Sequence, residues 1–105
     1  MALEITDKNF EILVLNNSKP VVIDFWAQWC GPCKTVSASI EAMAEEYEDQ
    51  VVIGKVDVDI NPELTSKFGI RNMPTVLYIK SGKIVGKHVG ATSKVVLEEK
   101  LKTIL

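Results

Sequence analysis

Two periodicities of apolar residues alternate along the chain. Runs rich in β-branched residues, which are typical of strands, predict strands at residues 3–5, 21–27, 51–58, 75–79 and 83–89. Other stretches carry apolar residues at three- and four-residue spacings, which predicts amphipathic helices. Residues 21–27 are apolar on both alternating faces, as expected for a central strand covered on each side. The pattern therefore predicts the order β-α-β-α-β-α-β-β-α.

Capping residues predict the ends of two of the helices. Thr6 or Asp7 can cap the first helix, which ends before a polar loop at residues 16–20. Asn61 and Pro62 are typical of the N-cap and first turn of a short helix, which Gly69 would end shortly afterwards.

The longest helix is predicted from Pro32 to about residue 47. Its apolar stripe contains Cys33 but not Cys30. If the helix starts at this turn, Cys30 lies at its tip and Cys33 faces inward. Pro32 fits there because the first N–H groups of a helix have no intrahelical partner. The last helix, at residues 93–105, is expected to bury Leu97, Leu101, Ile104 and Leu105.

The element order predicts one α/β domain over residues 1–105. Its β-α-β units favour parallel strands with right-handed crossovers and helices on both faces of the sheet. Residues 80–82, Lys-Ser-Gly, predict a hairpin that adds antiparallel strands at one edge. Gly86, inside the last strand, indicates a bulge or a close packing contact.

Composition and charge exclude several classes of protein. The 47% of apolar and 25% of charged residues are ordinary for a globular chain and exclude a disordered or fibrous one. A net charge of -2 offers no basic surface for nucleic acid and no polybasic patch for a membrane. No signal peptide or transmembrane run is visible and only two cysteines are present, so we expect a cytoplasmic protein.

The two cysteines, Cys30 and Cys33, form a Cys-x-x-Cys motif between a strand and a helix. Three sites are compatible with it: a dithiol redox centre, half of a zinc site, or a structural disulfide. Structural zinc takes four ligands, and the chain adds only His88, far along the sequence. A bridge across so short a loop removes little entropy from the unfolded chain. The β-α-β context favours the redox centre, so we expect no metal site and no catalytic role for His88.

Asp24 is a charged residue inside the apolar strand at residues 21–27. A buried carboxyl without a partner is costly, and burial raises its pKa. The alternative is an edge position with the side chain in water. Trp26, which precedes the turn, is interpreted as a core residue. Trp29 is adjacent to the first cysteine and is the better candidate for shielding the dithiol and touching a substrate.

Residues 23–34, Ile-Asp-Phe-Trp-Ala-Gln-Trp-Cys-Gly-Pro-Cys-Lys, resemble the active-site sequence of the thioredoxin family, of the bacterial type. Further matches at the family's spacings cover nearly the whole chain, at residues 57–59, 68–71, 73–75, 81–82 and 89–90. The Gly-Pro pair between the cysteines is typical of the reducing members. The resemblance implies the thioredoxin fold, a central mixed five-stranded sheet flanked by four helices.

The resemblance also implies a reaction. The Cys30 thiolate would attack a disulfide of a substrate protein, and Cys33 would then attack Cys30 and release the reduced substrate. A helix N-terminus favours such a thiolate, since its unpaired N–H groups and the helix dipole attract negative charge. Trp29, Gly31 and Pro32 would contact the substrate.

Asp24 acquires a role through the same resemblance. It would be a buried proton acceptor and donor for Cys33, coupled to Lys55 on the neighbouring strand. Lys55 taken alone is a solvated lysine. We therefore expect Asp24→Ala to raise stability while slowing thiol–disulfide exchange.

A second part of the substrate site is implied around Pro74. In the family this proline is cis and lies beside the dithiol, where the backbone of Met73 can pair with a substrate strand. Gly90 would leave room for the substrate chain; without the resemblance it is interpreted as a strand-end turn.

The chain departs from the family pattern at three positions. Ala38 stands where many members have a helix-kinking proline, so the helix is expected to be straighter or less sharply bent. Gln28 replaces a residue that is often acidic, and Met73 replaces a more frequent isoleucine.

The expected function is a thiol–disulfide oxidoreductase that reduces protein disulfides as a cytoplasmic monomer. Its expected partners are protein substrates and a thioredoxin reductase, with no nucleic acid or membrane partner. We expect no bound cofactor; NADPH would act only through the reductase, since no Gly-rich nucleotide fingerprint follows a strand. Two alternatives stay open: a disulfide isomerase or oxidase, and a docking subunit of the same fold whose dithiol is incidental.

Overall fold

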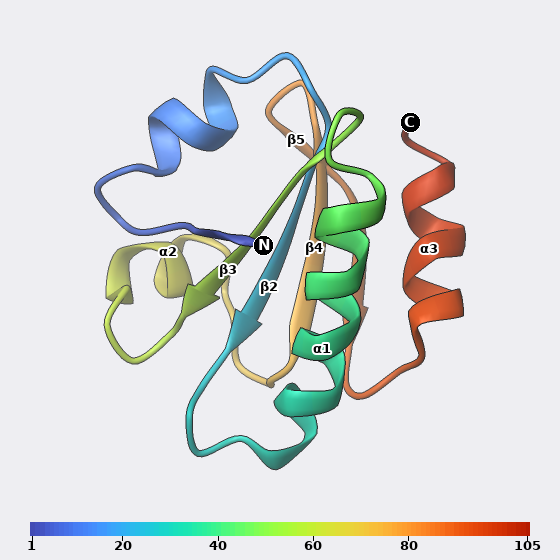
Figure 1. The fold of residues 1–105 in the computed structure, drawn as a ribbon. Coiled ribbons are helices and arrows are strands. Elements are labelled where there is room, and N and C mark those ends of the chain that lie inside the picture. Colours follow the sequence, from blue (N-terminus) through green and yellow to red (C-terminus); the bar gives the residue numbers. More distant parts are fainter.

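The central strand of the sheet is β2 (Val21–Trp26). In the computed structural model, which describes all 105 residues, β3 (Val52–Asp57) pairs with it in parallel and β4 (Thr75–Lys80) pairs antiparallel. The edge strands are β1 (Leu3–Glu4), parallel to β3, and β5 (Lys83–Val89), antiparallel to β4. The order β1-β3-β2-β4-β5 therefore confirms a mixed sheet with an antiparallel hairpin at one edge (Figure 1).

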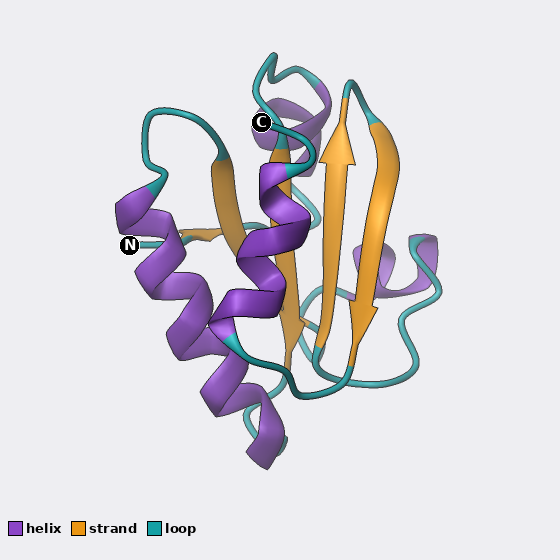
Figure 2. Ribbon diagram, turned by 90° about the vertical axis from the view of Figure 1, so that its right-hand side faces the viewer, coloured by secondary structure: helices purple, strands orange, loops and turns teal.

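Two helices cover each face of this sheet. The long helix α1 (Gly31–Glu46) and α3 (Lys94–Lys102) lie side by side on one face, as Figures 1 and 2 show. The opposite face carries the short helices η1 (Glu11–Leu15) and α2 (Pro62–Lys67). The predicted number and order of elements are thus confirmed.

The alternation of β2 separates two apolar cores. Val22 belongs to a cluster with residues of α1 and α3, among them Ile40 and Leu97. Ile23 and Phe25 point to the other side and pack in a second cluster with residues of η1 and α2. Because successive side chains of a strand face opposite sides, one strand anchors both helical layers.

The first helix differs from the predicted one in its hydrogen bonding. Thr6 caps the turn, as expected: its Oγ1 accepts from the N–H of Asn9 at 3.2 Å. The regular part is a five-residue π-helix, in which the Asn16 N–H donates to the Glu11 carbonyl five residues earlier at 3.0 Å. A π-helical turn is wider than an α-helical one, which the apolar spacing alone did not reveal.

The cap of α2 corrects a second prediction. Asn61 occupies the N-cap position, but its side chain makes no capping hydrogen bond. The cap comes from Asp7, which precedes η1 in the sequence. Its carboxylate accepts from the N–H groups of Glu63 at 3.2 Å and Leu64 at 2.9 Å. The Asn61 side chain instead accepts from the Asp7 N–H at 3.0 Å. These hydrogen bonds link the N-terminal segment to α2.

Two details at the C-terminal side complete the fold. The ladder between β4 and β5 shifts register beside Gly86, and a Cβ there would lie 3.2 Å from Lys100 Cδ, so both the bulge and the close contact are confirmed. In contrast, Leu105 is exposed and not buried. The other three residues expected in this part of the core are buried, Leu97 and Leu101 on α3 and Ile104 just after it.

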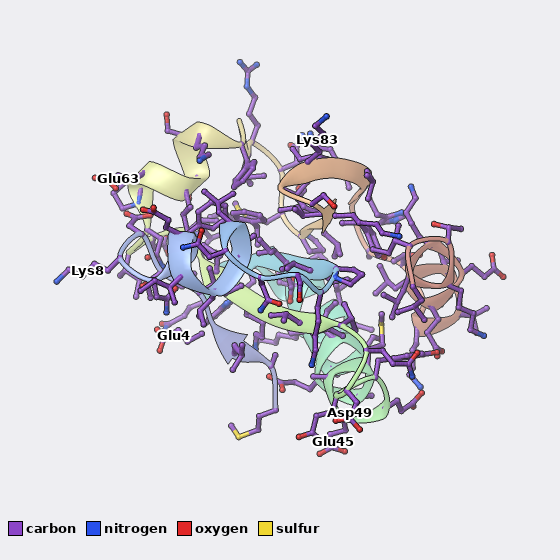
Figure 3. All side chains as sticks on the ribbon, turned by 90° about the horizontal axis from the view of Figure 1, so that it is seen from above. Glu4, Lys8, Glu45, Asp49, Glu63 and Lys83 are labelled. Atoms are coloured by element: carbon purple, nitrogen blue, oxygen red, sulfur yellow. A yellow bond between two sulfur atoms is a disulfide. The ribbon has the colours of Figure 1, made fainter.

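The charged side chains lie on the outside of the molecule. Figure 3 shows those of Glu4, Lys8, Glu45, Asp49, Glu63 and Lys83 pointing away from the centre. None of the helices is both long and apolar enough to cross a membrane. The charged residue that breaks this arrangement is Asp24, which is completely buried.

Candidate functional site: a dithiol at the start of α1

The two cysteines lie where the chain passes from β2 into α1, at the lower end of the sheet in Figure 1. They form a disulfide with a Cα–Cα distance of 5.4 Å. Cys30 is the N-cap of α1 and Cys33 is in its first turn, as the helical phase predicted. Both are buried in this form, with 5% of Cys30 and 1% of Cys33 exposed, so the predicted difference in exposure is small.

The helix start aims a hydrogen-bond donor at the first cysteine. The Cys33 N–H donates to Cys30 Sγ at 3.2 Å. Pro32 has no N–H to lose at this position, and both it and Gly31 are exposed. When the disulfide is opened, the same N–H and the helix dipole favour a negative charge on Cys30 Sγ.

Two distant segments border the disulfide. Met73 packs against the small cluster that contains both cysteines and Ala27. The Met73–Pro74 peptide bond is cis, as the resemblance implied, and Pro74 is buried. The Pro74 carbonyl accepts from the Gly90 N–H at 2.8 Å, which brings the end of β5 to the same place. Gly90 has a φ of +96° and faces open space, since a Cβ at this position would meet no atom within 4 Å.

The two tryptophans have different environments. Trp29, which precedes Cys30 in sequence, is 68% exposed, and its Nε1 donates to Asp59 Oδ2 at 3.1 Å, which holds the ring in place. Trp26 is half-buried and packs against the buried cluster of Ala27, Cys30 and Cys33, so it lies at the edge of the core and not inside it. One face of its ring is covered by Lys55, whose Nζ lies 5.1 Å from the ring centroid.

Asp24 lies behind the dithiol on the α1 side of β2. Its side chain is fully buried, which rejects the alternative of an edge position in water. Ser37 Oγ donates to Asp24 Oδ2 at 2.8 Å, while Asp24 Oδ1 has no hydrogen-bond partner. Burial raises the pKa of Asp24 from 3.8 to about 6; the Ser37 hydrogen bond and the charge of Lys55 oppose this rise, and Glu41 adds to it.

Lys55 stands beside Asp24 but pairs elsewhere. The two residues are in register on β3 and β2, yet they form no ion pair within 4.0 Å. Lys55 Nζ lies 3.5 Å from Glu41 Oε2, and the other oxygen of Glu41 accepts from the Ala2 N–H at 2.7 Å. The coupling of Lys55 to Asp24 is therefore a through-space attraction.

A pocket of about 350 Å³ opens beside these groups. Cys33, Ser37 and Lys55 are among its lining residues, whereas Asp24 is not. The sequence reasoning missed Ser37 and Glu41, although a signal existed. Both follow Cys33 at four-residue intervals, which places them on the same side of α1.

Other sequence predictions concern residues outside this cluster. His88 pairs with Val76 in the hairpin and is half-buried. No group of three or more His, Cys, Asp or Glu side chains is placed to hold a metal ion. Ala38, at the position of the family's helix proline, is an exposed residue within the uninterrupted α1.

Comparison with known proteins matches the chain to a single family. A model of the thioredoxin family matches residues 1–103. The chain is 46% identical to the thioredoxin of Chlorobaculum thiosulfatiphilum over 98 residues, which is 93% of this chain and 91% of that protein. It is 45% identical to the thioredoxin of Porphyra purpurea over 98 residues, covering 93% and 92%. Thioredoxin 1 of Nostoc sp. is 41% identical over 101 residues, covering 96% and 94%.

Proposed function

This chain belongs to the thioredoxin family, and from that premise we propose how its own residues perform the reaction. Membership and the Cys30–Cys33 pair make it a thiol–disulfide oxidoreductase that reduces disulfides in proteins. The observation that carries the mechanism is the position of Cys30 as N-cap of α1, with the Cys33 N–H directed at its sulfur.

In the first step, the reduced Cys30 acts as the nucleophile. Its thiolate attacks one sulfur of the substrate disulfide, the substrate S–S bond breaks, and the departing substrate sulfur takes a proton from water. A mixed disulfide now joins Cys30 to the substrate. The N–H of Cys33 supports this role because it stabilises negative charge on Cys30 Sγ before the attack.

In the second step, Asp24 acts as the proton acceptor. The Cys33 thiol passes its proton to the Asp24 carboxylate, and the resulting thiolate attacks Cys30 Sγ. The Cys30–Cys33 disulfide forms, the mixed disulfide breaks, and the second substrate sulfur leaves as a thiolate that takes a proton from water. Two electrons have then moved from the dithiol to the substrate. A pKa of about 6 supports this role, since Asp24 is mostly ionised at neutral pH yet close to protonation. Lys55 assists by favouring the ionised carboxyl.

The substrate chain is proposed to lie across the surface around the disulfide. Exposed Gly31, exposed Pro32 and the projecting Trp29 border it on one side. Met73 and Pro74 offer backbone groups on the other side, where a substrate strand can add by main-chain hydrogen bonds. The open space at Gly90 supports a close approach of that strand.

The oligomeric state, the compartment and the reductase partner are proposed from membership of the family. We propose that residues 1–105 act as one thioredoxin domain, as a monomer in the cytoplasm. A thioredoxin reductase would return the Cys30–Cys33 disulfide to the dithiol. The domain would need no bound cofactor of its own, and NADPH would enter only as the electron source of the reductase.

The test is the equilibrium reduction potential of the Cys30–Cys33 pair, measured by tryptophan fluorescence in a thiol redox buffer. We expect a potential of roughly -270 mV, the value characteristic of thioredoxins. A potential of about -180 to -120 mV would support the isomerase or oxidase alternative.

Two cysteine variants test the roles of the individual thiols. Cys33→Ser is expected to trap mixed disulfides with substrate proteins, and their absence would contradict Cys30 as the attacking thiol. The Cys30→Ser/Cys33→Ser double variant is expected to lose all activity. If it kept its function, the chain would act as a docking subunit.

A further inference from the structure

Ser37 is the one hydrogen-bond donor to the buried carboxyl of Asp24. Its Oγ lies 2.8 Å from Asp24 Oδ2, and the other carboxyl oxygen has no partner. Ser37 also lines the pocket that Cys33 lines, whereas Asp24 does not. The hydroxyl therefore lies between the buried carboxyl and the space beside the second cysteine.

We propose that Ser37 is a positioning residue for the proton transfer between Cys33 and Asp24, because its hydroxyl occupies one carboxyl oxygen and leaves the other to take the proton. This inference rests on the proposed role of Asp24 as proton acceptor. It adds a residue from the middle of α1 to the cysteines at the helix start and to Asp24 and Lys55 on the strands.

The chemistry of the two groups supports this assignment. An ionised carboxylate only accepts hydrogen bonds, and a serine hydroxyl can donate one. Once Ser37 donates to Oδ2, the unpartnered Oδ1 is the oxygen that can take a proton without competing with that hydrogen bond. Without the hydroxyl, both oxygens would be buried and unpartnered, so the ionised form of Asp24 would lose its direct stabilisation.

The surrounding charges cannot replace this hydrogen bond. Lys55 faces Asp24 from β3, but its Nζ is engaged by Glu41 at 3.5 Å. Glu41 faces it from α1 and carries the same charge as Asp24. On the β4 side, the cross-strand neighbour of Asp24 is Val76, which does not titrate. Of these neighbours, Ser37 is therefore the one whose removal should change the pKa of Asp24 most directly.

The experiment measures two titrations in Ser37→Ala. One is the pH dependence of disulfide exchange from about pH 5 to 9, and the other is the carbon NMR titration of the Asp24 carboxyl in the oxidised protein. The carboxyl titration, and the part of the exchange profile that depends on it, are expected to move up by about one to two pH units, because the hydrogen bond that stabilises the ionised carboxyl is lost. Ser37→Thr keeps the hydroxyl and is expected to restore the wild-type titration.

Ser39→Ala is the matched control on the same helix. It removes a hydroxyl that contacts the Thr35 carbonyl at 3.4 Å and not Asp24. Neither titration should move in this variant. Alanine is also a strong helix former, so both serine variants are expected to fold.

Asp24→Asn separates a failure of this inference from a failure of the proposed function. If Asp24→Asn exchanges disulfides as fast as wild type across this pH range, Asp24 is not the proton acceptor and the proposed function is wrong on this point. If Asp24→Asn slows exchange but Ser37→Ala leaves the carboxyl titration in place, the role of Ser37 is overturned while that of Asp24 stands. An equal shift in Ser37→Ala and Ser37→Thr would also overturn it, because the hydroxyl would then not be the cause.

Discussion

The two faces of the sheet share their strands but differ in what they bury. On the face covered by η1 and α2, ten apolar residues form the core cluster, and the buried polar residues there, Asn61 and Thr75, both have hydrogen-bonded side chains. There Phe68 packs edge-on against Phe10 and Phe25, with ring centroids 5.5 and 5.9 Å apart. On the face covered by α1 and α3, the core contains the hydroxyl of Tyr78, which donates to a carbonyl of α3 at 3.0 Å. The same face also buries Asp24.

Because of this difference, successive residues of β2 contribute either to stability or to the chemistry of the site, depending on the face to which they point. Burial of apolar surface stabilises by roughly 25 cal/mol per Å², so Ile23 and Phe25 contribute mainly to stability. Asp24 lies between them in sequence but faces the other side, where a buried carboxyl with an unpartnered oxygen costs free energy. The strand thus carries a destabilising group toward the dithiol, and the apolar face offsets its cost.

The largest change in stability is expected when an apolar side chain is removed from the core covered by η1 and α2. Phe25→Ala should lower the free energy of unfolding by about 3–5 kcal/mol, since a fully buried ring is removed and a cavity remains. Chemical denaturation measures this loss. The reduction potential should stay unchanged, and Phe25→Leu is the control with a smaller loss. A changed potential would show that the two faces are not independent.

The next effect concerns the charge on the opposite face. The folded-state pKa of Asp24 is raised, so between pH 3.8 and about 6 the folded chain binds more protons than the unfolded chain, and stability falls as pH rises. The shift corresponds to about 3 kcal/mol at roughly 1.36 kcal/mol per pKa unit. Asp24→Ala removes this fall, so its stability relative to wild type should rise by about 2.5 kcal/mol between about pH 4 and 8.

Denaturation of both proteins at the two pH values measures that difference, with the low-pH value as the internal control. Exchange should be slower in Asp24→Ala because the proton acceptor of Cys33 is lost. Unchanged exchange kinetics across about pH 6 to 9 would contradict the catalytic half of this prediction.

A smaller effect is expected where the N-terminal segment caps α2. Asp7→Ala leaves the N–H groups of Glu63 and Leu64 without their acceptor and should cost about 1–2 kcal/mol. Thermal denaturation measures the loss. Asp49→Ala removes a carboxylate that points into solvent and should be close to neutral (Figure 3). Equal losses in both variants would refute the capping role.

The smallest effect is expected at Glu41. Its negative charge raises the pKa of Asp24 and its carboxylate engages Lys55, so Glu41→Gln should lower the pKa of Asp24. This shift is opposite in sign to that of Ser37→Ala, and it should be the smaller one because Glu41 is partly exposed to solvent. The NMR titration of Asp24 measures it. Glu45→Gln, on the outer side of α1, is the control and should leave the titration in place.

Much of the fold was predictable because its signals are local. The alternation at residues 21–27 predicted a central strand with two covered faces, and the spacing from Pro32 onward predicted a helix that starts at the dithiol. The hairpin and its bulge followed from Gly82 and Gly86. Each of these features depends on residues close together in sequence, so the pattern of the chain is enough to predict them.

The errors involve interactions that sequence proximity does not reveal. The cap of α2 comes from Asp7, 57 residues before Leu64, and no local pattern distinguishes it from Asn61. Trp26 is half-buried because it packs against the edge of the small cluster of Ala27, Cys30 and Cys33, while Lys55 lies over its ring. Leu105 is exposed, whereas Ile104, which also lies beyond the end of α3, is buried.

The sequence by itself determined the order of elements, the two faces of β2 and the pair of cysteines at a helix start. The tertiary structure decided which groups contact the buried carboxyl and the charges near it. Ser37 donates a hydrogen bond to one oxygen of Asp24, and Glu41 pairs with the nearby Lys55. The physical reason is that periodicity places a residue on a face, whereas a pKa depends on atoms a few ångströms away. Those atoms come from α1 and β3, whose side chains meet Asp24 only once the sheet and helix have packed.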